Sequence, residues 1–383
     1  MSPYLLLSLI LGYFGILVLT SWFTSRGGDN QSFFVADRQA PWYLVAFGMI
    51  GASLSGVTFV SVPGAVGAGG GNNAFSYFQL VLGYFVGYQI IIRVLLPLYY
   101  RLNLTSIYEY LRLRLGSSSH YTGASFFLLS RTIGSSFRLY LVSMILDQFI
   151  LGPLGIPFAL TVVLTIALIW LYTYRGGMKT IVITDTFQTA FLLLAVMFSV
   201  YSMMGELGWS ALDLYQSMTS DALRCPDNGA QAGTPMDQIF FGDSGSRNFW
   251  KMFLSGIFIT VVMTGLDQDM MQKNLSCRNL RDAQKNMFWF YWVLLFINIL
   301  FLSLGALLYI YAQANQIAIP AKTDELYPML ALGGQFGTLA AVTFLLGIIA
   351  ASYASSDSAL TALTTSFCID FLSIEKFKEE KRT

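Results

Sequence analysis

The chain has 383 residues, of which 55% are hydrophobic and 11% are charged, and its formal net charge at pH 7 is +1. Soluble domains carry about 25% charged residues, so this composition excludes an ordinary soluble protein and indicates a polytopic membrane protein. The balanced charge argues against nucleic acid as a partner. Three scattered cysteines and a single histidine argue against a disulfide framework or a histidine metal site.

Nine apolar runs have the length that an α-helix needs to cross a bilayer. In chain order they are 4–24, 41–65, 74–99, 120–150, 153–173, 179–204, 249–270, 287–313 and 334–371. The first is expected to be a retained span, because it is too long for the apolar part of a signal peptide and follows no basic segment. The predicted fold class is an all-α, multi-pass protein of the cell (inner or plasma) membrane.

The lysines and arginines predict the orientation, because cytoplasmic loops carry an excess of them. With the N-terminus outside, sixteen lie at cytoplasmic ends or loops, four lie outside, and two fall within the fourth run. The sixteen are Arg26, Arg38, Arg93, Arg101, Arg112, Arg114, Arg175, Lys179, Lys273, Arg278, Arg281, Lys285, Lys376, Lys378, Lys381 and Arg382. The sequence therefore predicts an external N-terminus, a cytoplasmic C-terminus and a short cytoplasmic helix within 103–120 with a capping signal at Thr105. The ends of the long external loop, 209–218 and 236–241, are expected to lie on the surface.

The second run contains residues for which a plain membrane anchor has no use. Between Gly51 and Gly64 it holds Gly56, Pro63 and four hydroxyl side chains. Carbonyls freed by a broken helix at membrane depth persist only where protein buries them or where they bind something. Many transporters coordinate cations with such carbonyls. Small residues also let two membrane helices pack closely, so this stretch alone leaves both interpretations open.

One face of the ninth run collects small and hydroxyl side chains at the spacing i, i+3, i+4 and i+7, namely Ala351, Ala354, Ser355 and Ser358. Asp357 and Thr361 lie on the adjoining face. Hard cations prefer several oxygen ligands, and hydroxyls with freed carbonyls can supply them to Na⁺. The alternative is a packing seam whose hydroxyls bond back to the preceding turn. Membrane-embedded carboxylates are rare and usually functional, so Asp357 favours an ion site.

Three other carboxylates lie within or at the ends of the apolar runs. Asp185 is a second buried candidate, which either lines the exit route of a cation or pairs with Lys179. Asp267 and Asp269 close the seventh run on the cytoplasmic side, and we interpret them as helix-end structure rather than chemistry.

Arg138 lies deep in the fourth run. A buried guanidinium suits a substrate carboxylate, which it can bind through two parallel hydrogen bonds. The alternative is a structural ion pair with Asp147 or Asp357. The sequence leaves these two roles open.

Six motifs, in this order and spacing, resemble the solute:sodium symporters, whose members carry sugars, proline, sialic acid, pantothenate or iodide. They are Phe33–Arg38, Gly51–Gly56, Thr105–Leu111, Gly176–Asp185, Asp267–Gln272 and Ala354–Ser358. The resemblance covers nearly the whole chain and implies one transporter domain, 1–383, with an inverted five-plus-five core. Its parts would be an extra N-terminal span at 4–24, a first repeat at 41–204, an external loop at 205–248 and an incomplete second repeat at 249–371. The family core has two more helices after the ninth span, where this sequence stops.

The resemblance also implies ligands for the common Na⁺ site of the family. Carbonyls of Gly51, Leu54 and Ala351 would join the Ser355 hydroxyl. Most members have a second hydroxyl where this chain has Ala354. No other metal and no organic cofactor is expected.

A second ion and a substrate have implied positions too. Another Na⁺ or a proton would sit at Asp185, Asp357 and Ser358, and a hydroxyl is more usual where Asp357 stands. Substrate would lie against the break formed by Ser55, Gly56, Val57 and Thr58. Arg138 resembles in placement a carboxylate-binding arginine of the sialic-acid carriers.

The function expected from this resemblance is sodium-coupled import of a small polar solute by alternating access. A sugar, an acidic sugar or an amino acid would fit. The first alternative is a sensor or partner subunit that uses the same scaffold without transporting. The second, an intramembrane enzyme, has little support, because the sequence has no HExxH motif, no phosphate loop, no cysteine cluster and no serine–histidine pairing.

Overall fold

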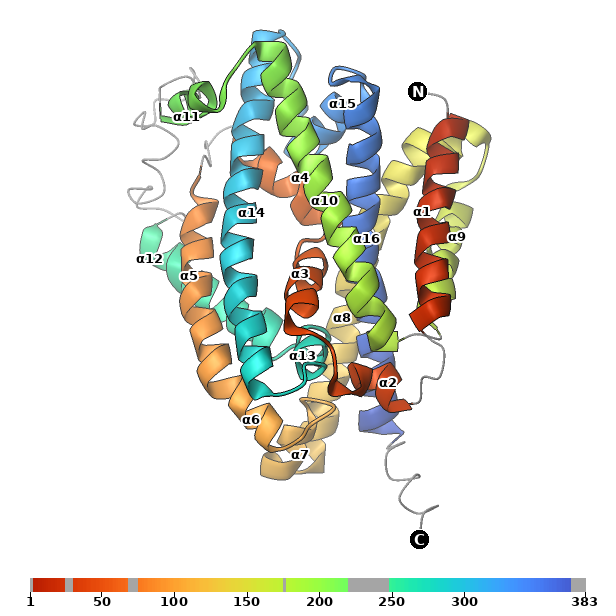
Figure 1. Cartoon of the computed structure of the whole chain (residues 1–383), viewed down its shortest axis with the longest axis vertical. Helices are drawn as coiled ribbons and strands as arrows, with labels where there is room; N and C mark the ends of the chain where they lie inside the picture. Colours follow the sequence, from red (N-terminus) through yellow and green to blue (C-terminus); the bar gives the residue numbers. More distant parts are fainter. Residues whose placement is uncertain (1–2, 25–29, 68–74, 175–176, 220–247, 373–383) are drawn as a thin grey trace.

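The computed structural model describes residues 3–24, 30–67, 75–174, 177–219 and 248–372. The described residues form an elongated bundle of helices that run roughly along one axis (Figure 1). The helices are α1 (Pro3–Thr24), α2 (Asn30–Val35), α3 (Trp42–Ser53), α4 (Gly56–Ala65), α5 (Tyr77–Ile90), α6 (Leu96–Arg101), α7 (Glu109–Leu115), α8 (Ser117–Leu146), α9 (Phe158–Thr173), α10 (Gly177–Leu207), α11 (Ala211–Thr219), α12 (Phe249–Thr260), α13 (Gln268–Leu275), α14 (Leu280–Ala314), α15 (Leu326–Leu332) and α16 (Gly337–Ser366). Wider π-helical turns extend α5, α8, α12 and α16.

Five of the described helical segments are long and apolar enough to cross a bilayer, and two bent helix pairs raise this number to seven. Helix α9 is apolar but has only 16 residues. Each of the nine predicted runs coincides with a helix or a bent pair, which confirms their helical character. Nine spans, the inverted repeat and the orientation of the termini stay predictions.

The second run is broken, as predicted. Helices α3 and α4 meet at an angle of 64°. Leu54 leaves the helical conformation with φ −88° and ψ 86°. The Ser55 hydroxyl then caps α4 by accepting a hydrogen bond from the Thr58 amide at 3.4 Å. A Cβ on Gly56 would lie only 2.1 Å from the Ser352 hydroxyl oxygen, so glycine lets the break approach α16 closely.

A second break, which was not predicted, separates α12 from α13. The two helices are also bent by 64°. The Asp267 carboxylate caps α13 by accepting a hydrogen bond from the Met270 amide at 3.2 Å. Asp267 and Asp269, which were predicted to end one helix, therefore begin the next.

Two glycines hold α5 and α12 in close contact. A Cβ on Gly83 would lie 2.1 Å from the Phe253 carbonyl oxygen, and a Cβ on Gly256 would lie 2.1 Å from the Leu80 carbonyl oxygen. Both obstacles are backbone, which cannot move aside as a side chain can. Membrane helices often pack through small residues in this way.

Gly256→Ala is therefore expected to lower the free energy of unfolding by about 1–3 kcal/mol, the usual cost of overpacking. Chemical unfolding in mild detergent would measure it. Gly12→Ala is the matched control, because a Cβ on this helical glycine meets nothing within 4 Å. Equal stability of the two variants would contradict the close contact.

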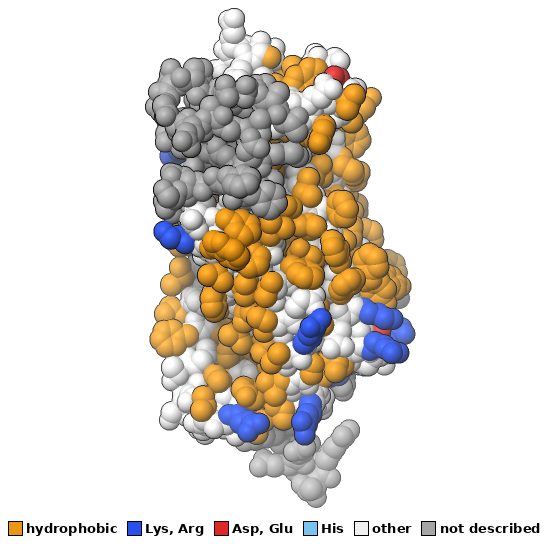
Figure 2. Space-filling model, turned by 90° about the vertical axis from the view of Figure 1, so that its left-hand side faces the viewer, with side chains coloured by type: hydrophobic (Ala, Val, Ile, Leu, Met, Phe, Trp, Pro, Cys, Tyr) orange, Lys and Arg blue, Asp and Glu red, His pale blue; other side chains and the backbone are white. Residues whose placement is uncertain are grey.

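The surface fits a protein embedded in lipid. Figure 2 shows apolar side chains along the length of one face, with most of its Lys and Arg side chains toward the lower end. Exposed apolar residues of the described chain include Phe85, Trp250, Leu254 and Phe258. Helix α1 begins at the upper end of Figure 1 and the run of α16 finishes at the lower end, where α2 and α7 lie.

The predicted short segments are partly found. Helix α7 begins at Glu109, so the capping signal expected at Thr105 is wrong; Ser106 instead accepts a hydrogen bond from the Tyr108 amide at 3.3 Å. Helix α11 matches the first surface segment of the long loop. The second, 236–241, falls outside the described residues.

Candidate functional site

The break between α3 and α4 packs directly on α16. A Cβ on Gly51 would lie 3.5 Å from the Ala354 Cβ. Within the described residues, no hydrogen bond reaches the carbonyl oxygens of Gly51 or Leu54. The break thus leaves carbonyls free beside the small-residue face of α16, and freed carbonyls of this kind are suited to a cation.

On α16, Ala351 and Ser355 flank this contact in sequence and are buried. The Ser355 hydroxyl donates to the Ser352 carbonyl oxygen at 2.9 Å, which is the back-bonding expected of a packing seam. Donation leaves the lone pairs of the hydroxyl oxygen available to a cation. Back-bonding and ion binding are therefore compatible here.

Thr189 on α10 fixes the last turn of α3, a role that was not predicted. Its hydroxyl oxygen accepts from the Gly51 amide at 3.0 Å and donates to the Phe47 carbonyl oxygen at 3.0 Å. A threonine inside an apolar helix gives no signal of this role in a single sequence.

The second candidate ion site is a buried charge cluster. Lys273 donates to Asp185 at 2.5 Å, and both side chains are at most 2% exposed. The alternative pairing of Asp185 with Lys179 is therefore wrong. Lys273 reaches Asp185 because α13 starts afresh after the second break and turns this side chain into the bundle.

Asp357 lies in the same cluster and is fully buried. It accepts hydrogen bonds from the Tyr172 hydroxyl at 2.8 Å and from the Ser358 amide at 2.6 Å. Asp185, Asp357 and Lys273 interact electrostatically. Two carboxylates against one ammonium leave one negative charge in excess, which a monovalent cation or a proton can balance.

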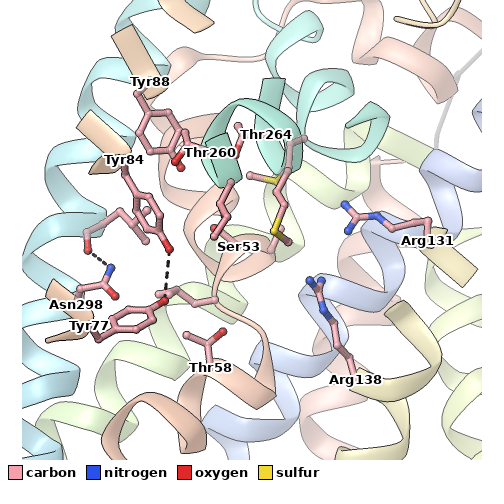
Figure 3. Close-up of a pocket in the computed structure, with 16 residues that line it drawn as sticks. Ser53, Thr58, Tyr77, Tyr84, Tyr88, Arg131, Arg138, Thr260, Thr264 and Asn298 are labelled. Atoms are coloured by element: carbon pink, nitrogen blue, oxygen red, sulfur yellow. Dashed lines mark hydrogen bonds between the residues drawn. The ribbon is translucent and has the colours of Figure 1, made fainter. Parts of the chain in front are cut away.

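A cavity of about 210 Å³ lies beside the break (Figure 3). It is lined by Ala52, Ser53, Leu54, Thr58, Tyr77, Tyr84, Tyr88, Arg131, Arg138, Ile259, Thr260, Met263, Thr264, Met270, Leu294 and Asn298. Of the four residues predicted to touch substrate at the break, Thr58 lines it. Ser55 caps α4 instead and Gly56 packs on α16, while Val57 is not among the lining residues.

Arg138 faces this cavity. Figure 3 shows it with Arg131 on one side of the cavity, opposite three tyrosines. Arg138 forms no ion pair within the described part of the chain. Asp147 accepts a hydrogen bond from Thr161 instead, and Asp357 accepts one from Tyr172. The alternative role of Arg138, a structural ion pair with Asp147 or Asp357, is therefore wrong.

The tyrosine wall was not predicted. Tyr77, Tyr84 and Tyr88 come from one face of α5 at the spacing i, i+7 and i+11, and the hydroxyls of Tyr77 and Tyr84 lie 3.5 Å apart. With Asn298 from α14 they oppose the arginines (Figure 3). Aromatic rings with polar tips can cover the apolar body of a ligand and bind its polar groups.

A larger cavity of about 850 Å³ is lined in part by α15, which lies toward the upper end in Figure 1. Val60 and Tyr140 line it, two residues beyond Thr58 and Arg138 on the same helices. Residues 320–325 and the start of α15 form its outer wall. The two cavities therefore follow one another along α4 and α8.

Comparison with known proteins gives a consistent result. The family model described as sodium:solute symporter family matches residues 33–382. The chain is 28% identical to the sodium-dependent multivitamin transporter of Oryctolagus cuniculus over 65% of its length, and 24% identical to the sodium/sialic acid symporter NanT of Aliivibrio fischeri over 94%. A solved structure of a Na⁺-coupled sialic acid symporter, in a substrate-bound outward-open state, shares the fold with a TM-score of 0.80 at 20% identity. That match covers 96% of this chain and 74% of the other.

The matches cover different shares of the relatives. The aligned region spans 36% of the multivitamin transporter and 68% of NanT. It spans 43% of the sodium-coupled monocarboxylate transporter 1 of Mus musculus, at 25% identity over 72% of this chain.

Proposed function

Because the chain belongs to the sodium:solute symporter family, we propose that it imports a small polar organic solute by sodium-coupled, secondary-active symport with alternating access. The observation that carries this proposal is the contact of the broken helix with α16, where Gly51 packs against Ala354. Within the described residues no hydrogen bond reaches the carbonyls of Gly51 and Leu54, and Leu54 also lines the polar cavity. A cation site that shares a helix break with a solute cavity couples the two ligands physically.

The proposed architecture is an inverted repeat with the N-terminus outside. Its support is that the first helix of each proposed repeat is bent by 64°, at Leu54 and at Leu266. Discontinuous helices in corresponding positions are typical of such repeats. The basic residues toward the lower end favour that end as cytoplasmic.

The proposed first Na⁺ site consists of the carbonyls of Gly51, Leu54 and Ala351 with the Ser355 hydroxyl. Ala354 stands beside Gly51 without contributing an oxygen. Asp185, Asp357 and Ser358 form the proposed second site, for Na⁺ or a proton. The excess negative charge of that cluster supports it, while Lys273 already engages Asp185.

The proposed substrate is a small organic solute that carries a carboxylate and other polar groups, such as an acidic sugar or an amino acid. Arg138 supplies a guanidinium that forms no ion pair with another described residue and can bind a carboxylate. Thr58, the tyrosine wall and Asn298 supply hydroxyls and an amide. One anion entering with one Na⁺ leaves the net charge of the site unchanged. The 850 Å³ cavity is the proposed entry from outside.

Arg138→Gln is expected to weaken binding of an anionic substrate about 10- to 100-fold, because hydrogen bonds to charged groups contribute about 1.5–3 kcal/mol. Na⁺ binding should persist. Equilibrium binding of sialic acids and amino acids, together with Na⁺-dependent thermal stabilisation, would measure both. Arg138→Lys should recover only part of the affinity, since it keeps the charge and loses the planar fork. Unchanged substrate affinity would remove Arg138 from the site.

Symport itself is tested with purified protein in liposomes. An inward Na⁺ gradient should drive accumulation of a solute identified by thermal shift, and a K⁺ gradient should not. Na⁺-dependent binding without uptake would favour the alternative, a sensor or partner subunit on the same scaffold. Equal binding in Na⁺ and K⁺ would refute the coupling.

A further inference from the structure

Arg131 holds the two sides of the polar cavity together. Its guanidinium bonds to Asp267 at 2.8 Å and to Asp269 at 2.5 Å. Arg131 comes from α8, whereas both acids belong to the start of α13, directly after the second helix break. The bridge therefore joins a continuous helix to the half-helix that a break allows to move.

We infer that the Arg131–Asp267–Asp269 bridge closes the substrate cavity on its cytoplasmic side and must open for release. This inference rests on the proposed function. Arg131 lies seven residues before Arg138, about 10 Å nearer the lower end at the rise of an α-helix. Both arginines line the cavity, so Arg131 stands between the proposed carboxylate site and the lower end.

Charge separates the roles of the two arginines. Arg131 already faces two carboxylates, so a substrate anion there would meet excess negative charge. Arg138, two turns away on the same helix, forms no ion pair within the described residues. Arg131 is therefore a positioning residue, and Arg138 is left to bind the solute.

The bridge pairs one guanidinium with two largely buried carboxylates, but its polar atoms are not all hydrogen-bonded. The three side chains are only 12%, 16% and 2% exposed. Yet the Arg131 Nε and the Asp269 Oδ1 are buried with no hydrogen-bond partner in the part of the chain that the structure describes. Unsatisfied buried polar atoms cost free energy. Water reaching them in an open state would repay part of the cost of separation, as a reversible gate requires.

Cysteine accessibility tests the gate. Met270 lines the cavity just past the bridge and is 4% exposed, so Met270→Cys reports on the lower side of the cavity. In a background with Cys225, Cys277 and Cys368 replaced by alanine, inside-out vesicles are treated with a membrane-impermeant maleimide. Arg131→Gln should raise the labelling rate about tenfold, a change in the closed-state population equivalent to about 1.4 kcal/mol.

Four further variants distinguish loss of the bridge from other effects on labelling. Arg138→Gln, on the same helix face, should leave the labelling rate unchanged. Asp269→Asn should act like Arg131→Gln, and the double variant should add little, because both remove one interaction. Arg131→Lys should restore most of the protection. If Arg131→Gln fails to fold, Asp267→Asn weakens the bridge while one ion pair remains.

Unchanged labelling in folded Arg131→Gln, or an equal rise in Arg138→Gln, would overturn the gate. Na⁺-dependent thermal stabilisation is measured in the same preparations. If Na⁺ does not stabilise the wild type, the proposed function is refuted. If Na⁺ stabilises the wild type but Arg131→Gln does not change the labelling rate, only the gate is refuted.

Discussion

Lys273→Met is expected to lower the free energy of unfolding by about 3–5 kcal/mol, because it leaves buried carboxylates with no counter-charge. The Lys273 side chain is 2% exposed and that of Asp185 is fully buried, with 2.5 Å between their charged atoms. Lys273 bonds Oδ2 of Asp185, and the Oδ1 atom has no hydrogen-bond partner among the described residues. Chemical unfolding in mild detergent at neutral pH would measure the loss.

A second substitution distinguishes the loss of the Lys273–Asp185 attraction from the loss of side-chain packing at Lys273. Asp185→Asn added to Lys273→Met removes the uncompensated charge, so the double variant should be clearly more stable than the single one. Lys285→Met is the matched control on an exposed part of α14, with an expected change within about 0.5 kcal/mol. If the double variant were no more stable than Lys273→Met, the ion pair would not be the source of the effect.

The two helix breaks show what a single sequence can and cannot reveal. The first was predictable because Gly51, Gly56 and Pro63 weaken the backbone hydrogen bonds of a helix, and nearby hydroxyls can bond the backbone groups that are freed. The second follows a wider turn that ends at Gly265 and depends on Asp267 capping α13. An aspartate near the end of an apolar run has the same local pattern whether it stops a helix or starts one.

The residues of the candidate site also fall into those that a single sequence can identify and those that it cannot. Arg138 and Asp357 were identifiable because a charge in a membrane span is costly and needs a reason. The tyrosine wall and Thr189 were not, since their roles arise only when distant helices are packed together. Lys273 was assigned to the cytoplasmic loops because the second break was not predicted. That break turns the Lys273 side chain toward Asp185.

The ion site itself makes the sharpest functional prediction. Ser355→Ala is expected to weaken Na⁺ binding about 10- to 100-fold, because one of few oxygen ligands is lost and an interaction with a charged group contributes about 1.5–3 kcal/mol. By linkage, Na⁺ should then raise substrate affinity by a smaller factor at any fixed Na⁺ concentration. Thermal unfolding over a Na⁺ titration measures the first effect, because a ligand of the native state stabilises it by mass action.

Ala354→Ser is the matched gain of function. The Ala354 Cβ lies 3.5 Å from where a Cβ on Gly51 would be, so an added hydroxyl would lie close to the freed carbonyl and supply a fifth oxygen. Na⁺ affinity should rise, and Ala354→Ser with Ser355→Ala should recover part of the loss. Ser356→Ala removes a neighbouring hydroxyl that also bonds the Ser352 carbonyl, and it should change Na⁺ affinity little. If Ser355→Ala and Ser356→Ala titrated alike with Na⁺, the ion would not bind at the contact between the broken helix and α16.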